Sequence, residues 1–490
     1  MAEHVDVIVV GAGISGVGTG YHLQTRCPDR SYVILEARAA MGGTWDLFRY
    51  PGIRSDSDMH TLGFSFHPWT QAKAIADGPS IRDYVRETAQ AYGIDKHIRF
   101  NTKVLSAEWS TPDARWTVEI ETENGRSSLT CNFLAMCSGY YSYDKAHAPS
   151  FTGSEDFAGR IVHPQFWPAD LDYRDKRVVV IGSGATAVTL VPEMARTAAH
   201  VTMLQRSPTY VVSRPAEDAV ANWLRRRLPS KLAYGMTRWK NVLFGMFFYR
   251  LTRKRPEKTK ERLLGMVREH LGPDYDIATH FTPRYNPWDQ RLCLVPDADL
   301  FAAIKAGSAE VVTDTIDRFE ADGIKLTSGK TIPADVIVTA TGLELSLMGG
   351  VPFSVDGKPV DLSEKLQYKG MMFSDVPNLA FTFGYTNASW TLKADLVAKY
   401  VCRLLNTMKR RGVRIATPHN DDPKLQAEAF VDFSSGYIQR AADRLPKQGS
   451  RKPWKLNQNY ALDVLALKFG SVDDAMVYSQ PESLSTRAAA

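Results

Sequence analysis

The sequence predicts an α/β fold with two Rossmann-like dinucleotide-binding domains and a helical insertion in the second domain. Two glycine-rich turns, Gly11 to Gly16 and Gly182 to Ala187, each follow a short apolar run that fits a buried parallel strand. A basic stretch with helical character, residues 214–285, follows the second turn. Because 490 residues are too many for one hydrophobic core, separate domains are expected.

Composition limits the class of protein. With 44% hydrophobic and 23% charged residues, the chain is typical of a globular protein. Its five cysteines include no C-x-x-C pair, which fits a reducing compartment and argues against enzymes that combine two nucleotide folds with a redox-active disulfide. The N-terminus has acidic residues where a signal peptide has Lys or Arg, and no apolar run is long enough to span a membrane. We expect a cytoplasmic protein without a metal site.

The first domain begins with a β-branched run, residues 5–10, suited to a buried strand. Gly11, Gly13 and Gly16 follow, with the spacing that allows a tight turn and a close approach of the backbone to a pyrophosphate at a helix N-terminus. Glu36 ends the next apolar strand, twenty residues after Gly16. An acid there accepts a hydrogen bond from a ribose 2′-hydroxyl and repels a 2′-phosphate, so the site prefers FAD or NAD over NADP.

A long Gly- and Pro-rich loop follows this strand, residues 42–56. Such a loop inside a compact domain is usually functional. Its last residue, Asp56, is also consistent with a turn-stabilising side chain, since Asp-Ser-Asp is common in loops. Further along the chain, Val104 lies in a short apolar strand that could hold the adenine end of a dinucleotide.

The second domain repeats the strand and turn, with Ala187 in place of the third glycine. Its second strand ends at Arg206, where the first domain has its glutamate. A guanidinium can bind a 2′-phosphate with two parallel hydrogen bonds, so the second site prefers NADP over NAD. We therefore predict FAD in the first domain and NADPH in the second. The predicted NADPH contacts are Gly182, Gly184, Thr186, Ala187, Arg206 and Ser207.

The insertion is strongly basic. Residues 225–262 contain thirteen Lys or Arg and two Glu, in a chain whose net charge is only +6. An apolar, aromatic-rich run, residues 239–249, lies within it and is too short to span a bilayer. The first interpretation is a lid over a lipophilic substrate pocket. A weak contact with an anionic membrane surface and a subunit contact are the alternatives. Nucleic-acid binding is not expected, because no reading motif accompanies the charge.

The segment between the two domains carries a motif. Phe157, Gly159, His163, Trp167 and Pro168 match F-x-G-x-x-x-H-x-x-x-W-P at every fixed position. This pattern resembles the signature of type I Baeyer–Villiger monooxygenases, and residues 42–56 resemble a second signature of that family, G-G-x-W-x-x-x-x-Y-P-G-x-x-x-D. Stretches such as GYTNASWTLKADL and LPKQGSRKPW are similar to the ethionamide-activating subgroup.

The resemblance implies both chemistry and site residues. Gly43, Thr44, Trp45 and Asp56 would lie along FAD, and Arg291 would match the catalytic arginine held by Asp56. O2 would add at flavin C4a after reduction by NADPH, and a small lipophilic ketone would become an ester or lactone. Sulfides and thioamides would also be oxidised at sulfur. In relatives a Lys often precedes this catalytic arginine and contacts the phosphate. Here Gln290 stands in its place, so the expected preference for NADPH over NADH is smaller.

A helix after the segment that contains Asn387 would place its positive end near the reduced flavin.

Two rival functions remain open: a flavin-containing monooxygenase acting mainly on N or S nucleophiles, and a non-enzymatic flavoprotein. The expected boundaries are 1–145 and 341–480 for the FAD domain, 146–172 for the linker, 173–213 and 286–340 for the NADPH domain, 214–285 for the insertion, 445–460 for a flexible lid with an aromatic tip, and 481–490 for a disordered tail.

Overall fold

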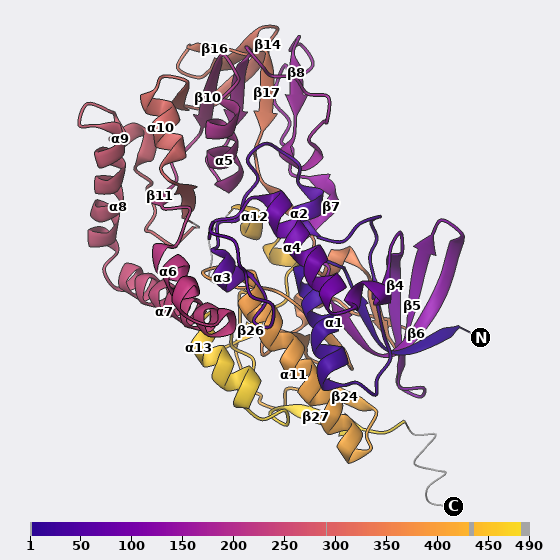
Figure 1. Cartoon of the computed structure of the whole chain (residues 1–490). Coiled ribbons are helices and arrows are strands. Elements are labelled where there is room, and N and C mark those ends of the chain that lie inside the picture. The colour runs from indigo at the N-terminus through magenta and orange to yellow at the C-terminus, as the bar shows by residue number, and fades with distance from the viewer. Residues whose placement is uncertain (1, 291, 431–435, 482–490) are drawn as a thin grey trace, which may run out of the picture.

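The computed structural model describes residues 2–290, 292–430 and 436–481. Two separate sheets dominate the architecture, one of nine strands and one of five (Figure 1). The nine-stranded sheet lies at the lower right of Figure 1 and the five-stranded sheet at the top, with a group of helices along the left side. The predicted α/β fold with two dinucleotide-type domains and a helical insertion is confirmed.

The first sheet is buried on both faces around its central strand, β1 (Glu3–Val10). Val7 and Val9 pack into one hydrophobic cluster, and Ile8 and Val10 pack into another on the opposite face. Helices α1 (Ile14–Arg26) and α11 (Trp390–Arg411) cover the first of these faces. The strand order is β20 (Lys358–Pro359), β19 (Phe353–Val355), β4 (Lys103–Ser110), β5 (Arg115–Thr122), β6 (Gly125–Met136), β1, β2 (Tyr32–Leu35) and β3 (Ile98–Arg99), and β23 (Leu379–Phe381) also pairs with β6.

The second sheet is entirely parallel. Its order is β13 (Ala309–Thr313), β10 (His200–Gln205), β9 (Arg177–Ile181), β17 (Val336–Thr339) and β8 (Arg160–Val162). Val178 and Val180 pack in the same cluster as the buried side chains of helix α5 (Ala185–Met194), while Val179 packs against a small antiparallel sheet. That small sheet consists of β14 (Ile316–Glu320), β15 (Gly323–Leu326) and β16 (Thr331–Pro333).

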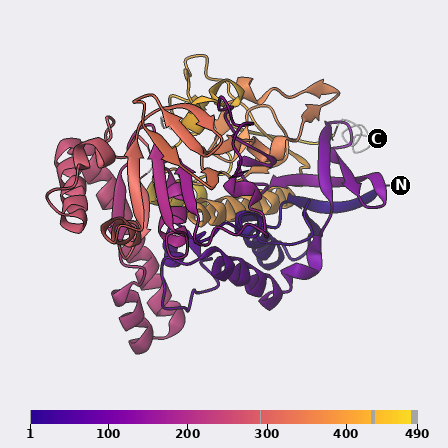
Figure 2. The ribbon, with the colours of Figure 1, turned by 90° about the horizontal axis from the view of Figure 1, so that it is seen from above.

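The insertion is bounded by two short strands that pair in parallel, β11 (Val211–Arg214) and β12 (Cys293–Pro296). Its helices are α6 (Ala219–Arg227), α7 (Ser230–Lys254), α8 (Pro256–Leu271) and α9 (Ile277–Phe281). Seen from above, they project to one side of the five-stranded sheet (Figure 2). The described part of the chain has no helix that is both long and apolar enough to cross a membrane.

An antiparallel ribbon joins the two sheets. It pairs β7 (Tyr141–Ala146), which follows β6 of the first sheet, with β18 (Leu343–Leu345), which follows β17 of the second. The remaining helices are α2 (Thr44–Leu47), α3 (Met59–Leu62), α4 (Gly78–Ala91), α10 (Asp299–Lys305), α12 (Gly436–Gln439), α13 (Tyr460–Asp463) and the π-helical turn η6 (Val464–Phe469). The remaining strands, all in two-stranded sheets, are β21 (Gln367–Tyr368), β22 (Met372–Phe373), β24 (Ile415–Pro418), β25 (Ala427–Glu428), β26 (Gln448–Gly449) and β27 (Met476–Ser479).

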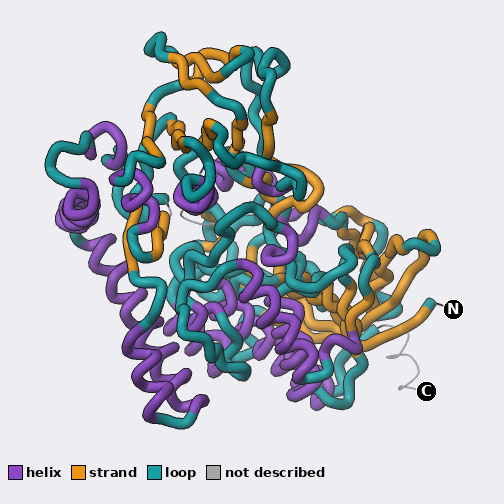
Figure 3. Tube along the Cα trace, turned by 45° about the horizontal axis from the view of Figure 1, so that its top comes forward, coloured by secondary structure: helices purple, strands orange, loops and turns teal. Residues whose placement is uncertain are grey.

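Figure 3 separates these elements by type. Strands are concentrated in the two sheets and helices on their flanks, while loops run through the space between the sheets. The C-terminal tail expected at residues 481–490 lies outside the described residues from 482 onward.

Candidate active site

The first glycine-rich turn closes tightly against the strands beside it. Gly11 has φ of 101°, and a Cβ there would lie 2.7 Å from the carbonyl oxygen of Cys137. At Gly16 a Cβ would lie only 1.8 Å from the carbonyl oxygen of Gly11. Gly13 is the N-cap of α1 and makes no side-chain cap bond, so the first N–H groups of that helix are left for another partner. An anion is favoured at such a helix N-terminus.

Glu36 stands at the end of β2, beside this turn. Its side chain is buried, with Oε2 accepting a hydrogen bond from the Ala12 N–H at 2.7 Å and Oε1 accepting one from the Arg38 N–H at 3.0 Å. Burial raises the pKa of Glu36, and these two hydrogen bonds oppose that rise. The carboxylate is therefore fixed in place before any ligand binds.

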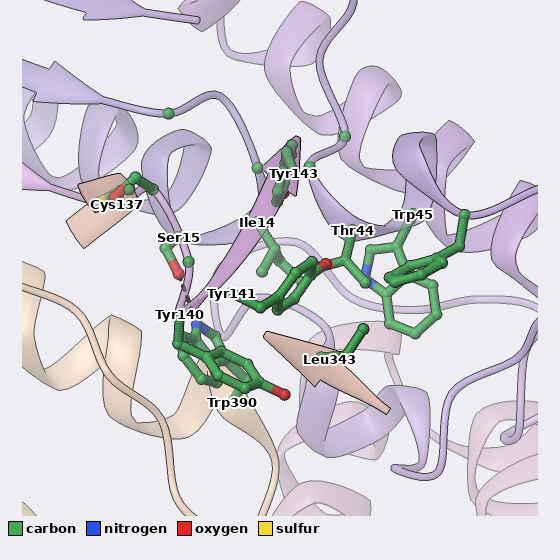
Figure 4. A pocket seen from close by; sticks show the side chains of 18 of the residues that line it. Ile14, Ser15, Thr44, Trp45, Cys137, Tyr140, Tyr141, Tyr143, Leu343 and Trp390 are labelled. Carbon is green, nitrogen blue, oxygen red and sulfur yellow. Dashed lines mark hydrogen bonds between the residues drawn. The ribbon is translucent and has the colours of Figure 1, made fainter. Parts of the chain in front are cut away.

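Aromatic side chains form a wall beside the α1 N-terminus (Figure 4). Trp390, the first residue of α11, donates its Nε1–H to Ser15 Oγ at 2.8 Å and stacks on Tyr140 with ring centroids 5.2 Å apart. Tyr141 OH lies 2.5 Å from Thr44 Oγ1, which links β7 to the N-terminus of α2. Burial raises the pKa of Tyr141, so its hydroxyl stays neutral.

The tyrosines of this aromatic wall were not among the residues predicted from the sequence. Tyr140, Tyr141 and Tyr143 line the same cavity as Trp390 and Thr44. The available signal was the run Tyr-Tyr-Ser-Tyr shortly after β6, since residues that follow parallel strands gather at one sheet edge.

The loop that ends at Asp56 joins the two domains. Asp56 lines the cavity. Tyr50 is buried and hydrogen-bonds Thr186 of the second domain; burial raises its pKa, and the charge of Asp56 adds to that rise. Arg54 Nη1 donates to Asp299 Oδ2 at 2.5 Å, which ties the loop to α10. Arg291 lies outside the described residues, so its predicted pairing with Asp56 stays a prediction.

The second turn is more open than the first. A Cβ at Gly184 would meet nothing within 4 Å, whereas one at Gly182 would lie 2.4 Å from the carbonyl oxygen of Ala340. Ala187, in the place of the third glycine, is fully buried under the sheet. Gly184 is the N-cap of α5 and makes no side-chain cap bond. The uncovered helix N-terminus therefore faces free space.

Arg206 and Ser207 lie directly after β10 and both are exposed. The Ser207 carbonyl accepts a hydrogen bond from Ser183 Oγ at 3.1 Å, which holds this loop against the second turn. The basic side chain thus stands beside the second turn, as Glu36 stands beside the first. The physical difference is that Glu36 is buried and Arg206 is exposed.

One cavity of about 690 Å³ connects the two turns. It is lined by Ala185 and Thr186 at the N-terminus of α5 as well as by Ile14 and Ser15 of α1. The predicted contacts among its lining residues are Gly11, Gly13, Glu36, Gly43, Thr44, Trp45, Asp56, Val104 and Thr186. The predicted contacts that do not line it are Gly16, Gly182, Gly184, Ala187, Arg206, Ser207 and Asn387.

Asn387 has a partner away from the cavity. Its Nδ2 donates to the carbonyl oxygen of Gln458 at 3.0 Å, while its neighbours Thr386 and Ala388 line the cavity. The side chain therefore ties the loop before α11 to the C-terminal part of the chain.

The segment that carries the linker motif packs into the second domain and onto the ribbon. Phe157 is buried against the small antiparallel sheet, and a Cβ at Gly159 would lie 2.3 Å from the Asp335 carbonyl oxygen. His163 Nδ1 accepts the Gln165 N–H at 3.1 Å, and Gln165 Nε2 donates to the Ser142 carbonyl at 2.9 Å. Burial lowers the pKa of His163. Trp167 is partly buried in the cluster behind α5, and Pro168 follows it. The motif therefore lies where the two domains join.

The predicted flexible lid at residues 445–460 is packed rather than free. Trp454, its expected aromatic tip, is only 3% exposed and makes an edge contact with Tyr368 at 5.6 Å. Leu445 and Gln448 are also buried. The Trp454 ring thus belongs to the core of the first domain, and motion of this segment as a lid stays a prediction.

These features fit two dinucleotides. At the first turn, an uncovered helix N-terminus, a fixed carboxylate and aromatic walls suit the pyrophosphate, ribose and flat ring of FAD. At the second, an uncovered helix N-terminus and an exposed arginine suit a nucleotide with a 2′-phosphate. The fold and the shared cavity thus define an oxidoreductase of the class that brings two dinucleotides together.

Comparison with known proteins narrows this class. The family models that match are "Flavin-binding monooxygenase-like" over residues 59–261 and "NAD(P)-binding Rossmann-like domain" over residues 9–78. The chain is 58% identical over 475 residues to the FAD-containing monooxygenase EthA of Mycobacterium tuberculosis (strain ATCC 25618 / H37Rv), covering 97% of both proteins. It is 55% identical over 479 residues to the same enzyme of Mycolicibacterium smegmatis, covering 98% of this chain and 97% of that protein.

Solved structures share the fold. A steroid monooxygenase bound to NADP superimposes with a TM-score of 0.77 at 22% identity, covering 97% of this chain and 100% of that one. An open structure of cyclohexanone monooxygenase superimposes with a TM-score of 0.74 at 19% identity, covering 98% of this chain and 100% of that one. From its relatives, this chain belongs to the family of FAD-containing monooxygenases.

Proposed function

We propose that this protein is a Baeyer–Villiger monooxygenase that uses FAD, NADPH and O2 to convert small lipophilic ketones into esters or lactones, and that it also oxidises sulfides and thioamides at sulfur. The observation that carries the proposal is the single cavity that reaches from Glu36 at the first turn to Thr186 at the second. Family membership and the two Baeyer–Villiger signatures in the sequence support it.

The first turn is the proposed FAD site. The N-terminus of α1 takes the pyrophosphate, Glu36 accepts a ribose hydroxyl, and Trp45, Tyr140 and Trp390 bound the ring end. The N-terminus of α11 begins at the same wall, where its positive end stabilises negative charge on a reduced ring.

The second turn is the proposed NADPH site. Gly184 leaves space for the pyrophosphate at the N-terminus of α5, and Arg206 binds the 2′-phosphate. Because Arg206 is exposed, its contact with the 2′-phosphate contributes less binding free energy than a buried ion pair does. The oxidised coenzyme can therefore leave and be replaced by NADPH.

The overall reaction balances without further reactants. NADPH and a proton supply two electrons and hydrogen, one atom of O2 enters the bond between the carbonyl carbon and its neighbour, and the other atom leaves as water. When bound, FAD accepts the hydride of NADPH and activates O2.

The protein's own contribution is electrostatic. Attack on a ketone builds negative charge on the carbonyl oxygen, and the guanidinium of Arg291 stabilises it, as the motif position of that residue indicates. Asp56 lines the cavity, and its proposed role is to hold this arginine. The aromatic wall excludes water from the reacting atoms.

The test is product analysis with labelled oxygen. The purified yellow protein is given NADPH, ¹⁸O2 and panels of linear, cyclic and aryl ketones and sulfides, and products are measured by mass spectrometry. We expect an ester or lactone carrying one ¹⁸O atom, with NADPH consumption that rises when the ketone is added. Consumption of NADPH with only sulfoxide as product would contradict the proposal.

A second candidate is a flavin-containing monooxygenase that acts on N or S nucleophiles. The match to the "Flavin-binding monooxygenase-like" family model favours it. The same product panel separates the two, because this candidate gives N- or S-oxides and leaves every ketone unchanged.

A further inference from the structure

Helix α7 (Ser230–Lys254) has two faces of different character. Tyr234, Arg238 and Val242 are on the buried face, spaced four residues apart. On the opposite face a row of large apolar side chains points to solvent. Its members and their exposed fractions are Leu232 (52%), Met236 (47%), Trp239 (47%), Leu243 (56%) and Phe247 (64%). An apolar stripe normally faces a protein core, so an exposed stripe marks a contact surface.

The buried face holds the helix firmly on the first domain. Arg238 is 7% exposed, and its Nη1 donates to the carbonyl oxygens of His60 at 2.9 Å and Gly63 at 2.8 Å, at the C-terminal end of α3. Asn241 Nδ2 donates to Asp58 Oδ1 at 2.9 Å. The outward stripe is therefore a fixed feature, since rotating the helix would break these bonds.

The apolar surface continues beyond α7. Trp239 contacts Tyr460 of α13 with ring centroids 5.8 Å apart, and the turn η6 that follows α13 exposes Leu465 (60%) and Phe469 (66%). Helices α7 and α13 lie side by side at the lower left edge in Figure 1. Below, the apolar patch means Leu232, Met236, Trp239, Leu243, Phe247, Leu465 and Phe469.

Positive charge accompanies the apolar patch. Helix α7 contains no Asp or Glu. Lys240 and Arg253 pair with Asp218 and Asp289, whereas Lys231, Arg250 and Lys254 are exposed on the same helix. Long basic side chains beside apolar ones suit the boundary between lipid headgroups and acyl chains. There the charged end of the side chain reaches the lipid phosphates, while its methylene groups lie against the acyl chains.

We propose that the apolar patch docks on the surface of an anionic lipid bilayer, with α7 parallel to the membrane plane. The charge complementarity selects this occupant, because a second copy would bring the same positive helix against itself. Helix α7 is not apolar enough to cross a membrane, so the proposed contact is with the membrane surface.

The docking surface lies one helix away from the proposed active site. Val242 packs against Tyr385 and Leu392, and Tyr385 lines the cavity. A lipophilic substrate dissolved in the bilayer would therefore be concentrated beside the cavity wall. This consequence rests on the proposed monooxygenase chemistry, whereas docking itself does not.

The test is co-flotation of the full FAD-loaded protein with vesicles of phosphatidylcholine alone or mixed with phosphatidylglycerol. We expect binding to the anionic vesicles that weakens but persists as salt rises, because salt screens the charge while apolar burial remains. Leu243→Ser with Phe247→Ser should lower the partition coefficient at least about tenfold, since both apolar side chains lose their burial in lipid.

Two further variants complete the design. Replacing Lys231, Arg250 and Lys254 by Gln should abolish the preference for anionic vesicles. Val477→Ser, which removes a side chain 50% exposed on β27, is the matched control and should bind like wild type. Bound flavin and the melting temperature show that each variant is folded.

The proposal is overturned if the wild type does not float with anionic vesicles, or if the double Ser variant binds as well as the Val477 control. It is also overturned if light scattering shows a dimer that the double Ser variant dissociates, because the apolar patch would then be a subunit interface. Ketone turnover in detergent-free buffer reports separately on the proposed function.

Discussion

The two glycine-rich turns share one backbone plan but differ in how the residues proposed to recognise the ribose are held. Glu36 at the first turn is 6% exposed and already accepts two backbone hydrogen bonds. Arg206 at the second turn is exposed, and the turn itself opens to free space at Gly184. The first site is preorganised and enclosed, as a resident cofactor requires. The second remains accessible, as a coenzyme that is exchanged in every cycle requires.

The third position of each turn shows the same difference in packing. Gly16 touches the backbone of Gly11 so closely that no side chain fits, whereas Ala187 carries its methyl group buried under the second sheet. At this position the first helix leaves no room for a side chain, whereas the second leaves room for a methyl group. Two turns of the same fold thus differ in local packing and in the burial of one charged residue.

Gly16→Ala breaks the first turn and has the largest expected effect. The added Cβ would lie 1.8 Å from the Gly11 carbonyl oxygen, so α1 must move away from the sheet. We expect protein that loses its FAD and is destabilised by several kcal/mol, above the range of about 1–3 kcal/mol for ordinary overpacking. Flavin absorbance and a denaturant titration measure both. A yellow protein of wild-type stability would show that the close approach is not needed.

Arg291→Ala tests the chemistry between the two turns. It should still bind FAD and be reduced by NADPH, because neither step needs this cation. Ester formation should fall by at least about 10²-fold, the usual loss for one preorganised charge stabiliser. Sulfoxidation should fall less, since oxygen transfer to sulfur builds no oxyanion on the substrate.

Asp56→Ala is the companion to this variant and should show a similar or smaller loss. Anaerobic stopped-flow reduction and product assays on a ketone and a sulfide give the comparison. An Arg291→Ala protein that makes ester at the wild-type rate would show that this arginine is not catalytic.

Glu36→Gln tests what the Glu36 carboxylate contributes to FAD binding at the first turn. The amide keeps the shape but loses the charge, and its NH2 group must face one of the N–H donors of Ala12 or Arg38. Losing charge-assisted hydrogen bonds costs about 1.5–3 kcal/mol, or roughly ten- to a hundredfold in FAD affinity. Titration of the apoprotein with FAD measures it, and unchanged affinity would mean that the carboxylate only stabilises the turn.

Ala187→Gly has the smallest expected effect. Removing the methyl group from the first turn of α5 should cost about 0.5–1 kcal/mol through helix propensity, plus a small loss of packing. NADPH should still reduce the flavin at close to the wild-type rate. A large loss of coenzyme affinity would show that the second site is as tightly built as the first.

Sequence reasoning predicted the elements that depend on local chemistry. The burial of Val7 and Ile8 on opposite faces of β1 follows from a continuous apolar run, and the two turns follow from glycine spacing. The placement of Glu36 and Arg206 after corresponding strands followed from counting residues.

Long-range contacts were not predictable in the same way. The bond from Trp390 to Ser15 joins residues far apart in the chain, and nothing local indicates it. Trp454 looked like the tip of a lid because Gly, Pro and Lys surround it, yet its ring is buried against Tyr368. For α7 the sequence favoured a lid and gave a membrane or subunit contact only as alternatives, because an apolar pattern does not say which face of a helix meets the protein.

We propose that the two turns have opposite preferences at the ribose, the first for a 2′-hydroxyl and the second for a 2′-phosphate. Anaerobic stopped-flow reduction of the bound flavin, with NADPH and with NADH, on wild type and Arg206→Ala, tests this most directly. Wild type should prefer NADPH about ten- to a hundredfold, and Arg206→Ala should lose most of this preference while reduction by NADH is almost unaffected. Equal loss with both coenzymes, or no preference in wild type, would contradict it.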